Sequence, residues 1–177
     1  MGLDDIREEI DQIDKKLRDL FLQRMELSHQ VAETKKLTKA DVYVPKRERE
    51  ILCVRTEGVK EDFLPECRAF FEQVMEISRA YQYSQMIEEQ ALLKGLPQNE
   101  GSIKICFSCP KESRQLSVFI NAARLAGLQL EKAETEKQSD GMQCRLWLSG
   151  CFSADLSRAV VLQMLKENET AVFTFIS

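Results

Sequence analysis

Residues 4–36 read DDIREEIDQIDKKLRDLFLQRMELSHQVAETKK, a run that contains neither glycine nor proline. Apolar side chains recur in it at alternating steps of four and three, with Arg24 taking one of the steps. They are Ile6, Ile10, Ile13, Leu17, Leu20, Leu27 and Val31. This spacing predicts one amphipathic helix of about 33 residues, which is about 50 Å long and exceeds the ~30 Å diameter of a small domain.

Two shorter helices are expected after the first. Residues 37–45 are predicted to form a loop that ends at Pro45, whose fixed φ suits the first position of a helix. This second helix ends before Gly58. The third is expected to run from about Glu61 to about Lys94, because its apolar residues again recur at helical spacing.

The pattern changes its period after this helical part. Glycine and proline between 95 and 101 indicate a linker, so we predict a helical domain over 1–95, a linker over 96–101 and a second domain over 102–177. The second domain shows strand and helix patterns in the order βαββαβ, which fits a ferredoxin-like sandwich and makes the chain a multidomain α plus α/β protein. The expected elements are strand 103–107, helix 116–126, strands 128–137 and 142–149, helix 156–166 and strand 171–176.

The bulk properties of the chain exclude several classes of protein. Hydrophobic residues make up 44% and charged residues 31%, as in ordinary soluble globular proteins. A net charge of −4 offers no basic surface to nucleic acid. No segment approaches the ~18 apolar residues of a membrane span, and the acidic N-terminus is unlike a secretory signal. We therefore expect a cytoplasmic protein that binds neither nucleic acid nor membrane.

Six cysteines and one histidine bear on a possible metal site. Cys106 and Cys109 form a C-x-x-C pair that Cys144 and Cys151 could complete to a four-sulfur zinc site. Because Cys144 lies in a strand-like run, we favour the alternative in which the cysteines are reduced, small apolar residues of a sheet. His29 has no second histidine with which to form a metal site, so a solvated helix position is expected. The sequence predicts no metal and no cofactor.

Positive charges interrupt the apolar face of the first helix. Arg24 occupies a position of the apolar repeat, and Lys35 continues the same face four residues after Val31. Arg7 adjoins Ile6 at the other end. An unpaired buried cation costs several kcal/mol, so each of these groups needs an anion.

The other two helices carry polar groups at matching places. Glu48 lies on the helical face of Leu52, and both Ser78 and Gln82 lie on the face of Val74. One carboxylate cannot neutralise three cations, whereas a small bound dianion could. Alternatively, the buried arginine fixes the helix register through an interhelical ion pair. The residues alone leave both interpretations open.

In their joint spacing these polar residues resemble the all-helical chorismate mutase family. The segment VYVPKRE, residues 42–48, is similar to the V-x-D-P-x-R-E motif that opens the second helix of the family. Val44 departs from it, because the family usually has aspartate before the proline, and this puts substrate affinity in question. The residues that match the family are Arg7, Arg24, Lys35, Arg47, Glu48, Ser78 and Gln82.

The resemblance implies a fold, an assembly and a reaction. Each protomer has three helices, and two protomers intertwine with their long first helices packed together, which would cover a helix too long for its own chain. The implied reaction is the unimolecular rearrangement of chorismate to prephenate in phenylalanine and tyrosine biosynthesis. Such a reaction needs no nucleophile or metal, only a compact substrate conformer and stabilisation of developing charge.

The resemblance also implies a role for each residue of the site. Arg24, with Arg7 of the partner subunit, holds the two substrate carboxylates, assisted by Ser78. Lys35 and Gln82 donate hydrogen bonds to the ether oxygen, which becomes more negative as the C–O bond breaks.

Two remaining residues complete the implied site. Glu48 accepts a hydrogen bond from the ring hydroxyl, and Arg47 organises Glu48. Because Gln82 is an amide, its contact does not require an acidic pH. Two alternatives stay open: an isochorismate pyruvate lyase on the same scaffold, and a non-catalytic dimer that senses chorismate-like ligands. Glu48 and Gln82 together favour the mutase.

The second domain resembles an ACT-type regulatory domain over residues 101–177. Its loop 110–116 stands where that family has a glycine-containing effector loop, yet it contains no glycine. Binding of an aromatic amino acid effector is therefore one hypothesis. A structural or dimerising module is the other.

Overall fold

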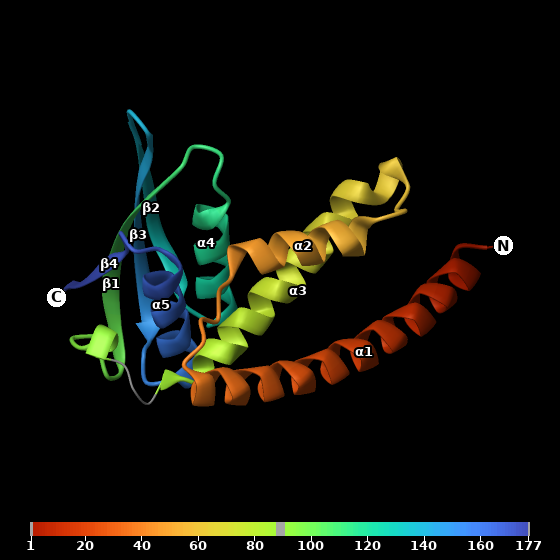
Figure 1. The fold of residues 1–177 in the computed structure, drawn as a ribbon, viewed down its shortest axis with the longest axis horizontal. Helices are drawn as coiled ribbons and strands as arrows, with labels where there is room; N and C mark the ends of the chain where they lie inside the picture. The colour runs from red at the N-terminus through yellow and green to blue at the C-terminus, as the bar shows by residue number, and fades with distance from the viewer. Residues whose placement is uncertain (1, 88–90, 177) are drawn as a thin grey trace.

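The computed structural model describes residues 2–87 and 91–176 and divides into a helical half and an α/β half (Figure 1). The predicted order of three helices followed by βαββαβ is confirmed. The helical half consists of α1 (Leu3–Thr38), α2 (Pro45–Thr56), a 3₁₀ turn (Glu61–Phe63) and α3 (Leu64–Ser84). The α/β half consists of β1 (Glu100–Cys109), α4 (Gln115–Leu125), β2 (Gln129–Gln138), β3 (Gly141–Cys151), α5 (Asp155–Glu167) and β4 (Val172–Ile176).

Helix α1 begins and ends with local signals in its own sequence. The Asp5 carboxylate accepts a hydrogen bond from the backbone N–H of Gly2 at 2.7 Å, and acidic residues in the first turn favour the positive end of the helix dipole. At the other end Lys39 takes a left-handed conformation, with φ of 54°, and its backbone N–H donates to the carbonyl of Lys35. The helix therefore spans 36 residues, slightly more than the sequence predicted.

Helix α3 is shorter than predicted: the expectation that it reaches Lys94 is wrong. It ends at Ser84, where the following backbone N–H groups bond to carbonyls three residues back and tighten the last turn. After the gap in the described residues, Leu93 and Leu96 are buried against the sheet core. These leucines pack against the α/β half instead of extending the apolar face of the helix.

The α/β half is a four-stranded antiparallel sheet with strand order β2-β3-β1-β4. Helices α4 and α5 cover one of its faces (Figure 1). The alternation that predicted the first strand is confirmed, because Ile103, Ile105 and Phe107 are fully buried. Gly141 starts β3 directly after the turn that leads from β2, and a Cβ there would collide with the backbone carbonyl of Cys109.

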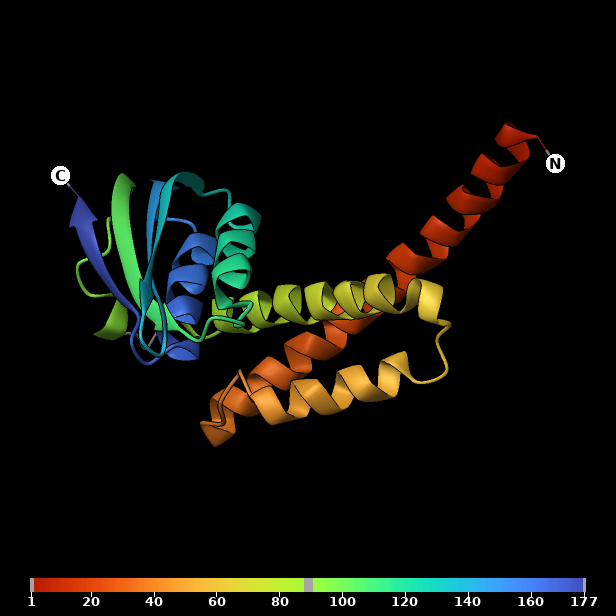
Figure 2. The same cartoon turned by 90° about the horizontal axis from the view of Figure 1, so that it is seen from above.

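One hydrophobic core joins the two halves. The sheet core continues into the last turns of α3 through Ala80 and Tyr83, and into the loop before α2 through Val42. Helix α3 leads from the helical half directly to α5 (Figure 2). The end of α3 is therefore packed against the α/β half.

The apolar face of α1 is uncovered in the single chain. Ser28 and Ala32 are its only buried residues within the described chain. The first half of α1 runs away from α2 and α3 (Figures 1 and 2). The exposed residues include every apolar member of the predicted repeat, namely Ile6, Ile10, Ile13, Leu17, Leu20, Leu27 and Val31.

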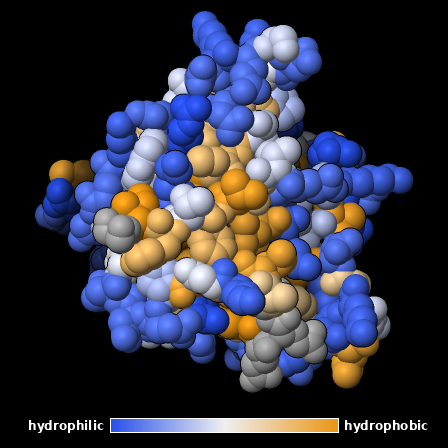
Figure 3. Space-filling view, turned by 90° about the vertical axis from the view of Figure 1, so that its left-hand side faces the viewer, coloured by the Kyte–Doolittle hydropathy of each residue, from blue (hydrophilic) through white to orange (hydrophobic). Residues whose placement is uncertain are grey.

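A second apolar surface lies on the opposite side of the molecule. Figure 3 shows apolar side chains gathered on the side where β4 and the C-terminal end lie. Val172 and Phe175 of this edge strand are more than half exposed. Within residues 2–87 and 91–176, no helix combines the length and apolar character needed to cross a bilayer.

Candidate active site

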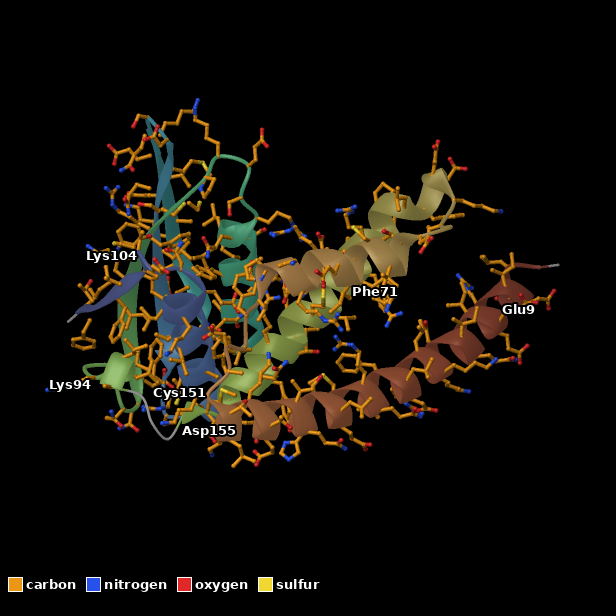
Figure 4. All side chains as sticks on the ribbon, viewed as in Figure 1. Glu9, Phe71, Lys94, Lys104, Cys151 and Asp155 are labelled. Carbon is orange, nitrogen blue, oxygen red and sulfur yellow. The ribbon has the colours of Figure 1, made fainter. Side chains whose placement is uncertain are left out.

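A cavity of about 140 Å³ lies between α1, α2 and α3. Six of the seven predicted site residues line it, and Arg7 does not. In Figure 4 the part of α1 that carries Glu9 lies far from this region. The lining residues are Arg24, Val31, Lys35, Val42, Val44, Arg47, Glu48, Ile51, Met75, Ser78, Arg79 and Gln82.

Arg24 projects from α1 towards α3. Its guanidinium donates hydrogen bonds to the Ser78 hydroxyl and, at 3.4 Å, to the Val74 carbonyl. Burial lowers the pKa of Arg24, and the nearby charge of Arg55 lowers that pKa further. Among the residues that the structure describes, no carboxylate lies within ion-pair distance of Arg24. Within residues 2–87 and 91–176, the guanidinium is thus a partly buried cation without a counter-ion.

Lys35 lies three turns further along the same helix. Its Nζ donates a hydrogen bond to the Val42 carbonyl at 2.9 Å, which ties the end of α1 to the loop before α2. Burial lowers the pKa of Lys35, while the more distant charges of Glu48 and Asp41 act in the opposite direction. No described carboxylate forms an ion pair with Lys35 either.

Helix α3 contributes Ser78 and Gln82, which are one turn apart and both buried. Ser78 Oγ donates to the Val74 carbonyl at 2.8 Å while it accepts from Arg24. The Oε1 atom of Gln82 has no hydrogen-bond partner among the described residues. Buried polar atoms almost always have a partner, so an unpartnered amide facing a cavity is suited to a polar ligand.

Glu48 is held by Arg79, a residue that the sequence analysis missed. The Arg79 Nη1 donates to Glu48 Oε1, and its Nε donates to Glu167 Oε1 at 2.8 Å. The Tyr43 ring lies 4.9 Å from the guanidinium. Arg79 is buried, and the two carboxylates raise its pKa in spite of that burial. Burial raises the pKa of Glu167 to about 7, although Arg79 favours its charged form.

A sequence signal for Arg79 does exist. Arg79 stands four residues after Met75 and four before Tyr83, and all three side chains are buried on α3. This is the same pattern of a cation on an apolar face that identified Arg24. Its partner Glu167 lies 88 residues away in the chain, so no local pattern links the two.

Two arginines of the predicted set lie apart from the other polar groups. Arg47 lines the cavity, but its side chain is largely exposed and pairs with Glu50 at 3.8 Å. Arg47 was expected to contact Glu48, but Arg79 makes that contact instead. Arg7 is also exposed, and pairs with Asp4 at 3.2 Å. Along the helix it lies about 25 Å from Arg24, beyond the reach of a side chain within one protomer.

Val44, the residue that departs from the family motif, is the N-cap of α2. It makes no side-chain capping bond, and its carbonyl accepts the first helical bond from Glu48 N at 3.2 Å. Pro45 follows at the start of the helix, as predicted. Because a valine side chain cannot accept a hydrogen bond, the first N–H groups of α2 lack the cap that an aspartate would provide.

Four of the six cysteines lie in the sheet, as the favoured alternative expected, whereas Cys53 and Cys67 lie in α2 and α3. Cys109 and Cys144 are buried in the sheet with their sulfur atoms 3.8 Å apart, and burial raises the pKa of Cys144 to about 12. His29 is exposed on α1, with Nδ1 3.2 Å from the Tyr81 hydroxyl. The described parts of the chain contain no group of three or more histidine, cysteine or acidic side chains that could hold a metal ion.

Comparison with known proteins agrees with the geometry of the helical half. Residues 6–83 match the family of chorismate mutase type II, and the match ends before the sheet begins. It supports an enzyme that isomerises chorismate to prephenate. No curated protein matches the chain significantly.

Proposed function

We propose that this protein is a chorismate mutase whose active site is the cavity between α1, α2 and α3. The observation that carries the proposal is that two cations lining that cavity, Arg24 and Lys35, form no ion pair with a described carboxylate. Arg79 is matched by two carboxylates, Glu48 and Glu167. Arg24 and Lys35 therefore keep two positive charges that no described carboxylate pairs with. A small dianion such as chorismate supplies two negative charges.

Five of the lining residues have roles that their geometry supports. Arg24, which is oriented by its hydrogen bond to Ser78, binds one carboxylate of the substrate. Lys35 and Gln82 approach the ether oxygen from α1 and α3 and stabilise the charge that develops as the C–O bond breaks. Glu48 accepts a hydrogen bond from the ring hydroxyl. The pocket acts by orientation and electrostatics, so it requires no proton shuttle.

The second substrate carboxylate requires a cation from another subunit. We propose a homodimer in which the exposed apolar faces of two α1 helices pack together, so that Arg7 of the partner subunit reaches the cavity. Two observations support this arrangement: the complete apolar repeat of α1 is exposed, and Arg7 is too far from its own cavity.

A spectrophotometric assay with purified protein tests the function. We expect loss of chorismate absorbance with formation of prephenate, and no release of pyruvate from isochorismate. Pyruvate release would assign the chain to the lyase alternative. Binding of chorismate without turnover would instead indicate a ligand sensor. Variants Lys35→Ala and Arg24→Ala extend the same assay to the site itself.

We propose that the α/β half is a ferredoxin-like, ACT-type domain that binds an aromatic amino acid. Its βαββαβ order with strand order β2-β3-β1-β4 supports the fold, and the core shared with α3 gives a bound effector a path to the site. Isothermal titration with phenylalanine and with tyrosine, paired with mutase kinetics, tests this role. Absence of heat with both amino acids would leave a structural or dimerising module.

A further inference from the structure

Arg79 is the one described hydrogen-bond partner of the Glu48 carboxylate. Glu48 comes from the first turn of α2, where the backbone leaves the carboxylate free to rotate. The Arg79 guanidinium fixes one of its oxygens from the neighbouring helix. A charge-assisted bond of this kind is short and directional, so it selects one rotamer of Glu48 at the cavity.

The α/β half holds Arg79 in turn. Glu167, at the end of α5, accepts from Arg79 Nε at 2.8 Å, and its side chain is only 3% exposed. The same Oε1 atom accepts from Gln163 at 3.1 Å. The backbone carbonyl of Glu167 accepts from Gln115 Nε2 at 2.9 Å, which ties the end of α5 to the start of α4.

The end of α5 is also fixed to the sheet. Asn168 follows Glu167 and donates to the Ser108 carbonyl of β1 at 2.9 Å and to Gln115 Oε1 at 2.7 Å. The position of Glu167 is therefore set by β1, α4 and α5 together. A chain of contacts runs from this scaffold through Glu167 and Arg79 to Glu48, and every residue in it is at least partly buried.

We propose that Arg79 is a positioning residue of the mutase site and that Glu167 makes the α/β half a structural part of that site, because together they orient the Glu48 carboxylate. The inference rests on the proposed function of the cavity. It adds a role for two residues outside the matched set, and it gives the α/β half a task in catalysis that does not depend on any effector.

A double-mutant cycle tests the proposal. Arg79→Met is expected to lower kcat/KM by about 10-fold or more, because displacement of a group at a reacting site by about 1 Å can cost up to ~10²-fold. In a Glu48→Gln background the same change is expected to lower kcat/KM by less than about 3-fold, since Arg79 acts only through Glu48. Arg79→Lys should restore part of the activity, because it keeps the charge.

Arg114→Met is the control for loss of an ion pair between the halves. Arg114 pairs with Glu72 and Glu76 of α3, away from Glu48. It is expected to leave kcat/KM within about 2-fold of the starting protein, because none of these three residues lines the cavity. Circular dichroism and thermal unfolding accompany every variant, so that lost structure is separated from lost orientation.

A second variant keeps the test decisive if Arg79→Met does not fold. Arg79→Met/Glu167→Gln removes a cation and an anion together, which avoids leaving the buried Glu167 carboxylate without its cation. Equal losses for Arg79→Met in both backgrounds, or no loss beyond that of Arg114→Met, would overturn the proposal while the starting protein still converts chorismate. A starting protein that does not convert chorismate would overturn the proposed function instead.

Discussion

Arg24 of α1 and Ser78 of α3 are joined by a hydrogen bond across the helical half, 54 residues apart in the chain. The contact fixes the guanidinium at the cavity without neutralising it, since a hydroxyl carries no charge. Lys35 is held in the same way by the Val42 carbonyl. Both cations are thus oriented by neutral partners, and their charge stays available for an anionic ligand.

Removal of either cation should abolish most of the activity. Lys35→Ala or Arg24→Ala is expected to lower kcat/KM by at least ~10²-fold, because loss of a buried charge-assisted contact costs about 3–5 kcal/mol. Steady-state kinetics with circular dichroism measures this. Arg18→Ala, on the exposed part of the same helix and paired only with Asp19 among the described residues, is the control. Turnover like that of the starting protein in either site variant would refute the assigned roles.

The alkaline limit of activity should follow the pKa of Lys35. Burial lowers this pKa from its ordinary value of 10.5, and the proposed role of Lys35 as a donor to the ether oxygen requires its protonated form. As the pH rises through the lowered pKa, kcat/KM is expected to fall, because kcat/KM reports groups of the free enzyme. Lys35→Arg should move this alkaline decrease of kcat/KM to higher pH, because arginine has a higher pKa. If kcat/KM decreases at the same pH in both proteins, the decrease does not report the pKa of Lys35.

Glu167 should make the protein less stable as the pH rises. Its pKa is about 7 in the folded chain against an ordinary value of 4.5, so between these values the folded state binds more protons than the unfolded state. The free energy of unfolding then falls with rising pH, by up to about 1.4 kcal/mol per pH unit in this window. Urea unfolding at several pH values should show this slope, and Glu167→Gln should remove it. An identical slope in the two proteins speaks against a raised pKa.

The apolar repeat of α1 should control assembly. Leu17→Glu places a charge in the middle of the exposed repeat and is expected to yield monomers, because a buried unpaired carboxylate is costly. Mutase activity should fall by at least about 10-fold, since the proposed contribution of Arg7 of the partner subunit is lost with the partner. Sedimentation velocity and kinetics measure both effects. Leu37→Glu is the control, because Leu37 is 85% exposed and lies outside the repeat. A dimer that withstands Leu17→Glu would exclude this interface.

A substitution at Val44 is expected to make the protein more stable. At the N-cap of α2, Val44→Asp would provide an acceptor for the first helical N–H groups and a favourable charge at the helix start. We expect the free energy of unfolding to rise by about 0.5–2 kcal/mol. Chemical denaturation measures the change, and Val44→Asn separates capping from charge. A loss of stability in both variants would show that the valine is favoured by packing.

The sequence alone predicted the structural features that depend on residues close together in the chain. The repeat in residues 4–36 predicted α1 to within two residues at each end, and alternation predicted the buried face of β1. Five polar positions at the cavity, Arg24, Lys35, Glu48, Ser78 and Gln82, were predicted because each lies on an apolar face of its own helix, whereas Arg47 came only from the family motif. The end of α3 was missed, since Leu93 fell within the predicted helix yet packs in the core of the α/β half.

Arg79 and Glu167 could not be joined from the sequence for a related reason. Each is a charged residue within an amphipathic helix, and such residues are usually solvated. Only the packing of α3 on α5 brings the two together and excludes water from them. Tertiary packing also decides which face of α1 its own chain covers, and Ser28 and Ala32 lie beside the apolar repeat, not in it.

The continuous core at the end of α3 has a consequence for how this protein can be divided. Tyr83 and Ala80 pack with residues of the sheet, so cutting the chain near residue 95 would expose an apolar helix end and leave Arg79 with one carboxylate instead of two. The segment that matches the mutase family is therefore not a detachable module in this chain. Engineering that transplants it elsewhere has to supply a substitute for the surface of α5.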